Sequence, residues 1–401
     1  MASHERRNDL VEKLRKELRG AGGEIRQYLY ELIRAETVSP PGNEHRAAAV
    51  VAKYLDRWKV PYRTYEKIPG RTNLVARVGS RRGPKLAVVC HTDVVPAGHG
   101  WRRDPFTPWM EKGRVFGRGA CDNKGQLAAI LALLRRLKLA ETSLPGEFIL
   151  VCAADEECGS SFGMVYLLEK GFFKADAAII PDIGHNMKAV SIAEKGLLDI
   201  RVTAHGRQAH GSAPHLGVSA IWGIHDFLAE IRAHPLKARG HSLLSPPTCN
   251  VGVIRGGDAA NMVPAQCDVV LNIRYLPSQT ARGILAEMRR HARKAARRTK
   301  GVRFDLTMET DLPPVALPAS SPVVRVIRDS SRRVLGREPR LIGLSGTTVA
   351  KQFMEHGIPA VGFSPGDASA AHVANESVSL DELVRFAAVM GDAAVAFLGG
   401  K

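Results

Sequence analysis

The chain has 401 residues, of which 45% are hydrophobic and 24% are charged. This length and balance exclude a disordered, collagen-like or disulfide-scaffold protein and predict two globular domains. Lys and Arg number 57 against 40 Asp and Glu, so the formal charge is +17, and a nucleic-acid or membrane-surface partner has to be considered.

The start of the chain and its cysteines point to a cellular compartment. The first twenty residues are charged throughout and lack the apolar segment of a secretory signal. No apolar run of the sequence reaches the ~18 residues that a membrane helix needs. The six cysteines form no C-x-x-C pair, and four lie in or beside apolar runs, as buried thiols do. We therefore expect a cytoplasmic protein without a thiolate-ligated zinc site.

Helical patterns cover the first 60 residues, and short apolar runs then alternate with helical stretches up to about residue 190. Residues 86–90, 148–154 and 176–181 have the composition of buried strands, and residues 125–138 have a helical pattern. Buried apolar strands that alternate with helices predict a mostly parallel sheet with helices on both faces.

After residue 193 the pattern changes to strand, helix, two strands, helix and strand. This β-α-β-β-α-β order is typical of a small ferredoxin-like sandwich. The α/β pattern resumes from about residue 310 and ends in an amphipathic helix over 379–398. We therefore predict an α/β catalytic domain in two segments, residues 1–192 and 310–401, interrupted by an inserted α+β lid or dimerisation domain at residues 193–309.

Side chains that can bind metals follow three of the predicted strands. His91 and Asp93 follow the first strand, Glu156 and Glu157 the second, and Asp182 the third. Because ligands gather at the carboxyl ends of parallel strands, we expect these side chains to lie together. The spacing of His91 and Asp93 suits a metal-bound imidazole held by a carboxylate, although a solvated turn has the same pattern.

Three further features have two interpretations each. Asp122 directly precedes a helix, and is either an ordinary N-cap or a ligand that bridges two cations. Glu156 and Glu157 are either two solvated acids or a metal ligand beside a general base. His372 lies in a loop of small residues, where plain exposure is the simpler interpretation. The glycine-rich segment 117–125 contains neither G-x-G-x-x-G nor a P-loop, which argues against nucleotide binding.

Taken together, these segments resemble a known family of di-zinc metallopeptidases. The motifs are HTDVVPAG, GRGACDNKG, ADEECGS, PDIG, GRQAHGSAP and AHVANE, and the resemblance runs from about Ile25 to Leu398. The family includes aminoacylase, carboxypeptidase G, acetylornithine deacetylase, succinyl-diaminopimelate desuccinylase and carnosinase-type dipeptidases. The resemblance implies a zinc-binding α/β domain with an inserted lid or dimerisation domain, which matches the architecture expected from the pattern.

The resemblance also implies which residues bind two metal ions. His91 and Asp182 would bind one ion, Glu157 and His372 would bind the other, and Asp122 would bridge the two. The ions would be zinc, and cobalt or manganese would suit the same nitrogen and oxygen ligands.

The resemblance implies the remaining roles as well. Glu156 would be the general base that activates water and then protonates the leaving amine, and Asp93 would orient a metal-bound histidine. His210 in the inserted domain would help to stabilise the oxyanion. The residues implied to contact the substrate are Asn261, Arg274 and Lys351, the last replacing an arginine of the relatives.

The resemblance predicts hydrolysis of a peptide or N-acyl amide bond in a small amino-acid derivative. Asp182 stands where the deacylase branches usually have glutamate, and in this it is similar to the aminopeptidase and dipeptidase branch. A dipeptidase is therefore slightly favoured, and the alternative is a deacylase of the acetylornithine deacetylase or succinyl-diaminopimelate desuccinylase type. A homodimer through the inserted domain is also expected.

A nucleic-acid-binding protein is a remote alternative. The run RRHARKAARRTK at residues 289–300 is strongly basic, but no aromatic residue interrupts it and no nucleic-acid-binding motif accompanies it. A solvated helix face explains the run without any partner. A catalytically inactive relative is a third class, and the complete set of expected ligands argues against it.

Overall fold

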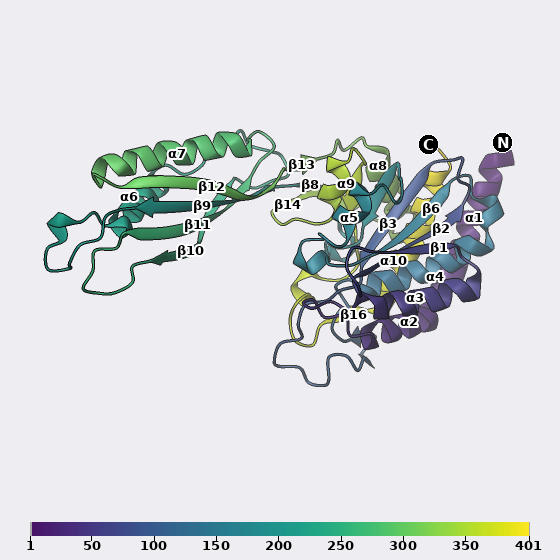
Figure 1. Ribbon diagram of the computed structural model, residues 1–401. Helices are drawn as coiled ribbons and strands as arrows, with labels where there is room; N and C mark the ends of the chain where they lie inside the picture. The colour runs from purple at the N-terminus through teal and green to yellow at the C-terminus, as the bar shows by residue number, and fades with distance from the viewer. Residues whose placement is uncertain (1, 401) are drawn as a thin grey trace. The chain divides into compact units, whose positions relative to one another are not determined.

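The computed structural model describes residues 2–400, with side chains described from residue 9 onward. The chain forms two compact units (Figure 1). The main unit comprises the described residues up to Ile192, Leu317–Ile342 and the residues from Thr348 onward. The inserted unit comprises Ala193–Ala316 and Gly343–Thr347. None of the described helices has the length and apolar character of a membrane-spanning segment.

A nine-stranded sheet with the order β1-β2-β6-β3-β7-β15-β8-β13 forms the basis of the main unit; β14 also pairs with β8, and β13 belongs to the residue range of the inserted unit. Its strands are β1 (Tyr62–Glu66), β2 (Thr72–Gly79), β3 (Lys85–His91), β6 (Glu147–Ala153), β7 (Ala177–Ile180), β8 (Ala189–Glu194), β13 (Val315–Ala316), β14 (Arg340–Leu344) and β15 (Ala360–Gly362). The central strands β6, β3, β7 and β15 pair in parallel, and antiparallel pairs flank them. The predicted α/β class is confirmed.

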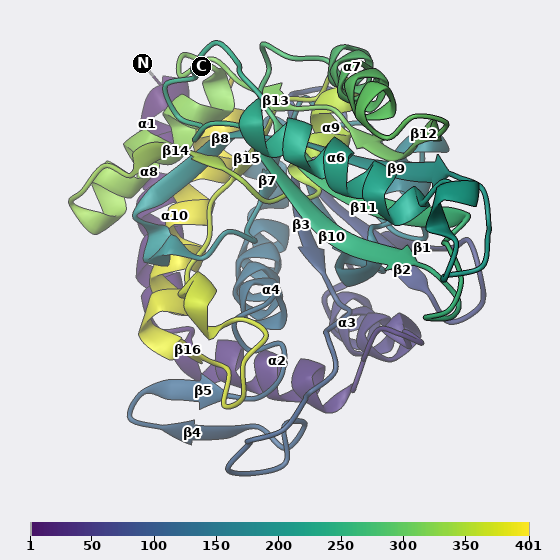
Figure 2. The same cartoon turned by 90° about the vertical axis from the view of Figure 1, so that its left-hand side faces the viewer.

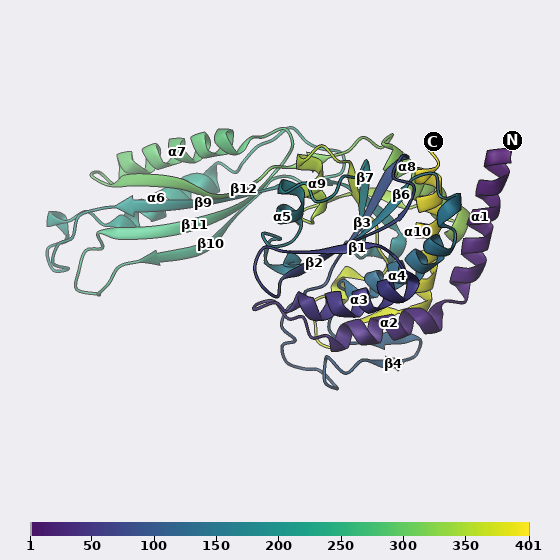
Figure 3. The same cartoon turned by 45° about the vertical axis from the view of Figure 1, so that its right-hand side comes forward.

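Helices cover both faces of this sheet. They are α1 (Ala2–Arg19), α2 (Gly22–Arg34), α3 (Glu44–Trp58), α4 (Lys124–Leu139), α5 (Met164–Glu169), α8 (Pro322–Leu335), α9 (Ala350–Glu355) and α10 (Leu380–Leu398). Alternate residues of β3 and β6 pack against α5 and α9, while α4 and α10 pack on the other side (Figure 3). Every residue of β6 is buried, which is why its sequence is a continuous apolar run rather than an alternating one.

The inserted unit has the predicted β-α-β-β-α-β order. Its elements are β9 (Gly196–His205), α6 (Ala220–Ala233), β10 (Thr248–Gly256), β11 (Gln266–Tyr275), α7 (Ala281–Arg298) and β12 (Arg303–Leu312). The sheet is antiparallel with the order β10-β11-β9-β12 (Figure 2). Alternate residues of β9 and β11 form one core with α6 and α7, so both helices cover the same face. Strand β10 is an edge strand and is largely exposed.

A three-stranded antiparallel sheet, which the sequence pattern did not predict, links distant parts of the main unit. It consists of β4 (Trp109–Glu111), β5 (Arg114–Phe116) and β16 (Ser377–Ser379), in the order β16-β5-β4. The pairing Val378 with Val115 brings the loop before α10 against the loop before α4. Two segments far apart in the sequence are thereby fixed beside each other.

Candidate metal centre

Three neighbouring parallel strands deliver metal-ligating side chains to one edge of the main sheet. His91 is the last residue of β3 and pairs with Ala153, the last residue of β6. Glu156 follows β6 by a short turn, and Asp182 follows β7. One ligand atom from each of His91, Glu156 and Asp182 lies within 4.8 Å of the others. The expected gathering at the carboxyl ends of the strands is therefore present.

Asp122 lies at the centre of the group. Its Oδ1 is 2.8 Å from Nε2 of His91, and its Oδ2 is 3.2 Å from Nε2 of His372. Nε2 of His372 is also 3.1 Å from Oε1 of Glu157, and Nε2 of His91 is 3.8 Å from Oδ2 of Asp182. The two oxygens of one carboxylate thus face two different histidines, as a carboxylate that bridges two cations must.

Asp93 contacts His91 and also supports the turn after β6. Nδ1 of His91 donates to the backbone oxygen of Asp93 at 3.0 Å, whereas the Asp93 carboxylate is 3.5 Å away. That carboxylate accepts the backbone N–H groups of Glu156 and Glu157, each at 3.1 Å. The main chain of Asp93 therefore orients the imidazole, and its side chain fixes the turn that carries the two glutamates.

The carboxylates hold protons on both histidines. Burial opposes protonation of His91, but hydrogen bonds with Asp122 and Asp182 outweigh it and keep the pKa of His91 well above its usual value. Hydrogen bonds with Asp122 and Glu157 raise the pKa of His372 to about 10. Burial opposes ionisation of Asp122, but His372 and His91 keep its pKa well below the usual range. These protons neutralise the same carboxylates that a metal cation would neutralise.

Two other acids of the group are harder to ionise than ordinary carboxyl groups. Burial, with the charge of Asp122, raises the pKa of Asp182 to about 6. Burial, with the charge of Asp182, raises the pKa of Glu156 well above its usual value. Buried carboxylates this close are stable in ionised form only beside cations, and the nitrogen and oxygen donors fit divalent zinc, cobalt or manganese.

Glu376 supports the loop that presents Asp122, and sequence reasoning missed it. Its buried carboxylate accepts the backbone N–H groups of Gly119, Cys121 and Asp122 at 3.0, 2.8 and 3.0 Å, and it pairs with Arg118 at 2.7 Å. Glu376 is the last residue of the AHVANE motif, so the motif that identified His372 also contained Glu376. Its role is visible only once β16 brings that segment to the loop.

A second buried network supports the turn that carries the two glutamates. Arg71 binds Glu44 at 2.7 Å and Asp155 at 3.0 Å, and all three side chains are almost inaccessible. Asp155 immediately precedes Glu156 and has a left-handed backbone with φ of 65°. No local pattern predicts this network, because its members come from three separate segments.

The other predicted residues lie apart from this group in the chain. His210, Asn261 and Arg274 belong to the inserted unit. Nδ1 of the exposed His210 accepts the backbone N–H of Ser212 at 3.1 Å, so Nε2 carries the proton. The N–H of Gly211 donates to the backbone oxygen of Asn261 at 2.7 Å, which places the two motifs side by side. Arg274 lies on β11, opposite Thr248.

Lys351 is in the main unit and is fully buried on α9, next to residues of the core that includes Phe353. The role of Lys351 in substrate binding stays a prediction.

An α/β sheet with histidines and carboxylates gathered at its strand ends defines the class of metal-dependent hydrolases. Residues 87–396 match the model of peptidase family M20/M25/M40, and the chain belongs to that family. The resemblance seen in the sequence is confirmed. The protein is a metal-dependent amide hydrolase.

The proteins that this chain resembles include deacylases and an aminopeptidase. It is 33% identical to acetylornithine deacetylase of Myxococcus xanthus over 346 residues, which are 82% of this chain and 85% of the relative. It is 30% identical to succinyl-diaminopimelate desuccinylase of Methylobacterium radiotolerans over 388 residues, 92% and 96% of the two chains. The crystal structure of aminopeptidase PepT from Bacillus cereus has a TM-score of 0.78 at 20% identity and covers 94% of this chain and 99% of its own. That likeness shows the shared fold.

Proposed function

We propose that this protein hydrolyses an amide bond in a small amino-acid derivative with two divalent metal ions bound at the strand-end group. The observation that carries the proposal is the placement of Asp122, whose two oxygens face His91 and His372 at 2.8 and 3.2 Å. Asp182 lies on the His91 side and Glu157 on the His372 side. The group therefore divides into two ligand sets that share one carboxylate.

Zinc is the proposed metal, because the donors are imidazole and carboxylate groups without thiolate. The proposed ligands are His91, Asp182, Glu157, His372 and the shared Asp122. When bound, the two ions supply Lewis acidity that polarises the scissile carbonyl and lowers the pKa of the attacking water.

Glu156 is the proposed general base. It is adjacent to Glu157, but the carboxylate that contacts His372 is that of Glu157, which supports a division of roles between the two. Both backbone N–H groups are held by Asp93, so the two side chains leave the turn in fixed directions. Glu156 would accept a proton from the attacking water and then donate it to the leaving nitrogen.

The inserted unit is proposed to complete the site. His210 carries its proton on Nε2 and is exposed, so it can donate to a developing oxyanion. Asn261 and Arg274 are proposed to contact the carboxylate end of the substrate, together with Lys351.

N-acylated amino acids are the first substrate class to test. The support is the identity of 33% and 30% with a deacetylase and a desuccinylase over most of the chain. Dipeptides are the second candidate, because Asp182 stands where deacylases usually have glutamate. A longer glutamate at this position would change how the ligand reaches the metal and so the shape of the adjoining pocket.

A homodimer through the inserted unit is the proposed assembly. Apolar side chains are exposed on α6 and on the edge strand β10: Ile221, Trp222, Val251, Val253 and Ile254. An exposed edge strand beside apolar side chains is typical of a surface that another protein chain buries in an interface. Sedimentation equilibrium of the full chain and of Trp222→Glu tests this, and a monomeric wild type would contradict it.

We also propose a cytoplasmic location. Three of the six free cysteines, Cys90, Cys121 and Cys152, are buried in the main unit, and burial raises the pKa of each thiol, which keeps it unreactive. Cell fractionation with an antibody to the protein checks the location.

The function is tested by hydrolysis of a mixed panel with zinc- or cobalt-loaded protein. The panel holds N-acetyl and N-succinyl amino acids beside dipeptides with free amino ends, and Glu156→Gln is the control. Turnover of acylated amino acids alone supports the deacylase, and turnover of dipeptides alone supports the peptidase. Equal rates for wild type and Glu156→Gln would contradict the proposed mechanism for either substrate.

A further inference from the structure

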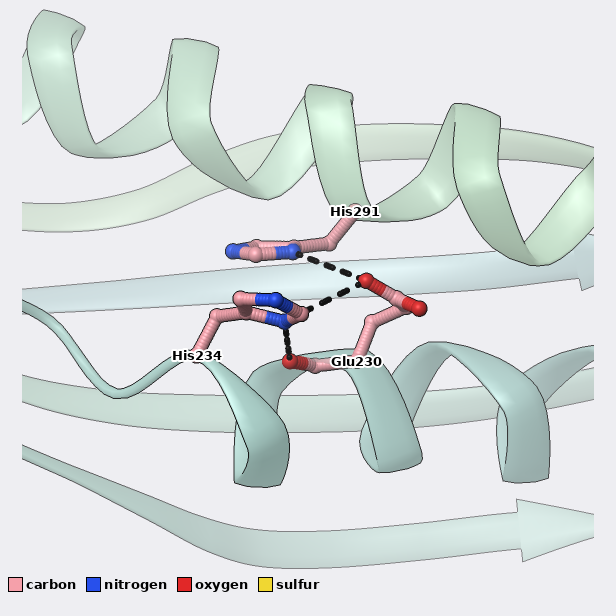
Figure 4. A group of neighbouring side chains, drawn as sticks. All are labelled: Glu230, His234 and His291. Carbon is pink, nitrogen blue, oxygen red and sulfur yellow. Dashed lines mark hydrogen bonds and ion pairs between the residues drawn. The ribbon is translucent and has the colours of Figure 1, made fainter.

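A second group of metal-ligating side chains lies in the inserted unit. Glu230 and His234 are one helical turn apart at the end of α6, and His291 faces them from α7 (Figure 4). One ligand atom from each residue lies within 4.8 Å of the other two. The amide-hydrolase mechanism uses none of these three residues.

His291 is a buried histidine whose ring nitrogens form no hydrogen bond within the described part of the chain. Its side chain is 6% exposed. Nδ1 is 3.9 Å from Oε2 of Glu230, and Nε2 is 3.9 Å from Oε1 of Glu287 on the same helix. Both distances exceed a hydrogen bond. A buried imidazole with two unsatisfied nitrogens is rare, and here Nδ1 faces the carboxylate of Glu230 while the ring stacks on that of His234, with 5.9 Å between the ring centroids.

His234 is prepared as a ligand by its hydrogen bond. Its Nδ1 is 3.1 Å from the backbone oxygen of Glu230, to which it can donate only as N–H. Nε2 then carries the lone pair. A metal-bound histidine typically donates its other ring N–H to a carbonyl or carboxylate in this way. The side chain is 54% exposed, so a cation and a water molecule can reach it from solvent.

Glu230 supplies the negative charge. It is 2% exposed, and its Oε2 is 3.4 Å from Nδ1 of His234 and 3.3 Å from Nζ of Lys294, while Oε1 is 2.5 Å from Arg298. Lys294 and Arg298 are both about half exposed and approach the buried carboxylate from outside. A divalent cation at Oε2 would displace the Lys294 ammonium into solvent and leave the Arg298 pair in place.

We propose that Glu230, His234 and His291 bind one Zn²⁺ ion that links α6 to α7, separate from the strand-end centre. Two imidazoles and one carboxylate are the donor set of zinc sites with an open fourth position, and they disfavour Ca²⁺ and Mg²⁺, which prefer oxygen ligands. The open position lies on the His234 side, where the group reaches solvent. The ion would clamp the two helices of the inserted unit.

The test counts zinc in the full-length protein. Protein stripped with a chelator is reloaded with Zn²⁺, freed of unbound metal and measured by mass spectrometry. His234→Ala should carry one zinc per chain fewer than wild type, whatever the wild-type total, and should keep full amide-hydrolase activity. His225→Ala removes another exposed histidine of α6 and should keep the wild-type count. Equal zinc in wild type and His234→Ala overturns the proposal.

A second measurement separates this site from the strand-end centre. The double variant His91→Ala/His372→Ala lacks a proposed ligand of each catalytic ion, and should still bind one Zn²⁺. Adding His234→Ala to the double variant should abolish that binding. Adding His291→Gln should also abolish it, and glutamine fills most of the buried space of the imidazole, so that no cavity is created. A double variant that binds no zinc overturns the helix site and leaves the catalytic proposal untouched.

Zn²⁺ and the ammonium group of Lys294 would compete for the carboxylate of Glu230. This competition predicts a change in zinc affinity that a cluster with a purely structural role would not show. Lys294→Gln removes the ammonium that shares Oε2 of Glu230, so the Zn²⁺ dissociation constant measured in the double-variant background should fall several-fold. An unchanged or weaker affinity removes Glu230 from the ligand set and overturns the proposed site.

Discussion

The two groups of metal-ligating side chains are built on different secondary structure. At the strand ends, parallel pairing of β3 with β6 and β7 fixes where His91, the glutamates and Asp182 emerge, and Asp93 and Glu376 hold the connecting loops. Between α6 and α7, the ligands are held by helix packing, and the single carboxylate already has Lys294 and Arg298 as partners. A sheet edge thus holds ligands ready for a cation, whereas the helix pair must first release one. We expect tighter binding at the strand ends.

Removal of the shared carboxylate should have the largest effect. Asp122→Ala should abolish binding of both catalytic ions and lower kcat/KM by more than about 10³-fold, since even one oxyanion donor is worth about 10²–10³. Asp381→Ala on the surface of α10 is the matched control and should match wild type. Retention of two ions by Asp122→Ala would show that this carboxylate does not bridge them.

Substitutions of the two adjacent glutamates should distinguish loss of the chemical step from loss of metal binding. Glu156→Gln should lower kcat by about 10²–10⁴-fold with the metal content unchanged, as expected for a general base. Glu157→Gln should lose metal from the His372 side. Metal analysis and initial rates of both variants check this, and the reverse pattern would exchange the two roles.

His210 in the inserted unit should contribute less, and its removal should affect turnover rather than metal binding. His210→Ala should lower kcat by about 10²–10³-fold, the usual cost of one oxyanion donor, without changing metal content or thermal stability, because the side chain is exposed. His215→Ala is an exposed neighbour in the same segment and serves as the control. An unchanged kcat for His210→Ala would exclude His210 from the reaction.

The helices α1, α8 and α10 share a buried ion-pair network whose contribution to stability should depend on pH. Asp392 on α10 is 2% exposed and is bound by Arg333 and Ser330 of α8 and by Arg15 of α1. Burial opposes its ionisation, but these groups keep its pKa below the usual 3.8. A lowered pKa stabilises the fold at pH values above about 4, and this stabilisation is lost as the pH falls through the lowered pKa.

Asp392→Ala should therefore cost about 3–5 kcal/mol at pH 7, the typical cost of leaving a buried charge unpaired. The loss should shrink as the pH is lowered from 7 towards 2, because the wild-type carboxylate takes up its proton as the pH falls through its lowered pKa. Urea unfolding at the two pH values measures both effects. A constant difference at all pH values would mean that packing, not charge, accounts for the loss.

Graded chelation should give the smallest effect on activity. If the strand-end centre binds more tightly, the first equivalent of zinc removed should come from α6 and α7 and leave the hydrolysis rate unchanged. Activity that falls in proportion to the first zinc lost would reverse the ranking of the two sites.

Much of the main unit could be predicted because its buried strands are continuous apolar runs that stop at polar side chains. The run that ends at His91 and the one that precedes Asp155 both form strands of the central sheet. Because the carboxyl ends of parallel strands lie at the same edge of a sheet, the polar side chains that follow these strands are expected to lie together. His372 could be assigned only by resemblance, because its loop returns to the site after the inserted unit.

Other features had no local signal. The strands β4, β5 and β16 have three residues each, too short for any periodicity. The spacing of Glu230 and His234 is visible in the sequence, but their partner His291 comes from a different helix. Buried networks such as Arg71 with Glu44 and Asp155 depend on tertiary packing and not on neighbouring residues.

The position of β15 determines the order in which the protein can mature during synthesis. This strand pairs with β7, yet it follows the whole inserted unit in the chain, and His372 and Glu376 come later still. During synthesis the whole inserted unit therefore emerges from the ribosome before β15, so the main sheet still lacks this internal strand when the inserted unit is complete. The newborn chain therefore lacks His372 and Glu376, and with them a complete metal centre, until the segment that follows the inserted unit has been synthesised.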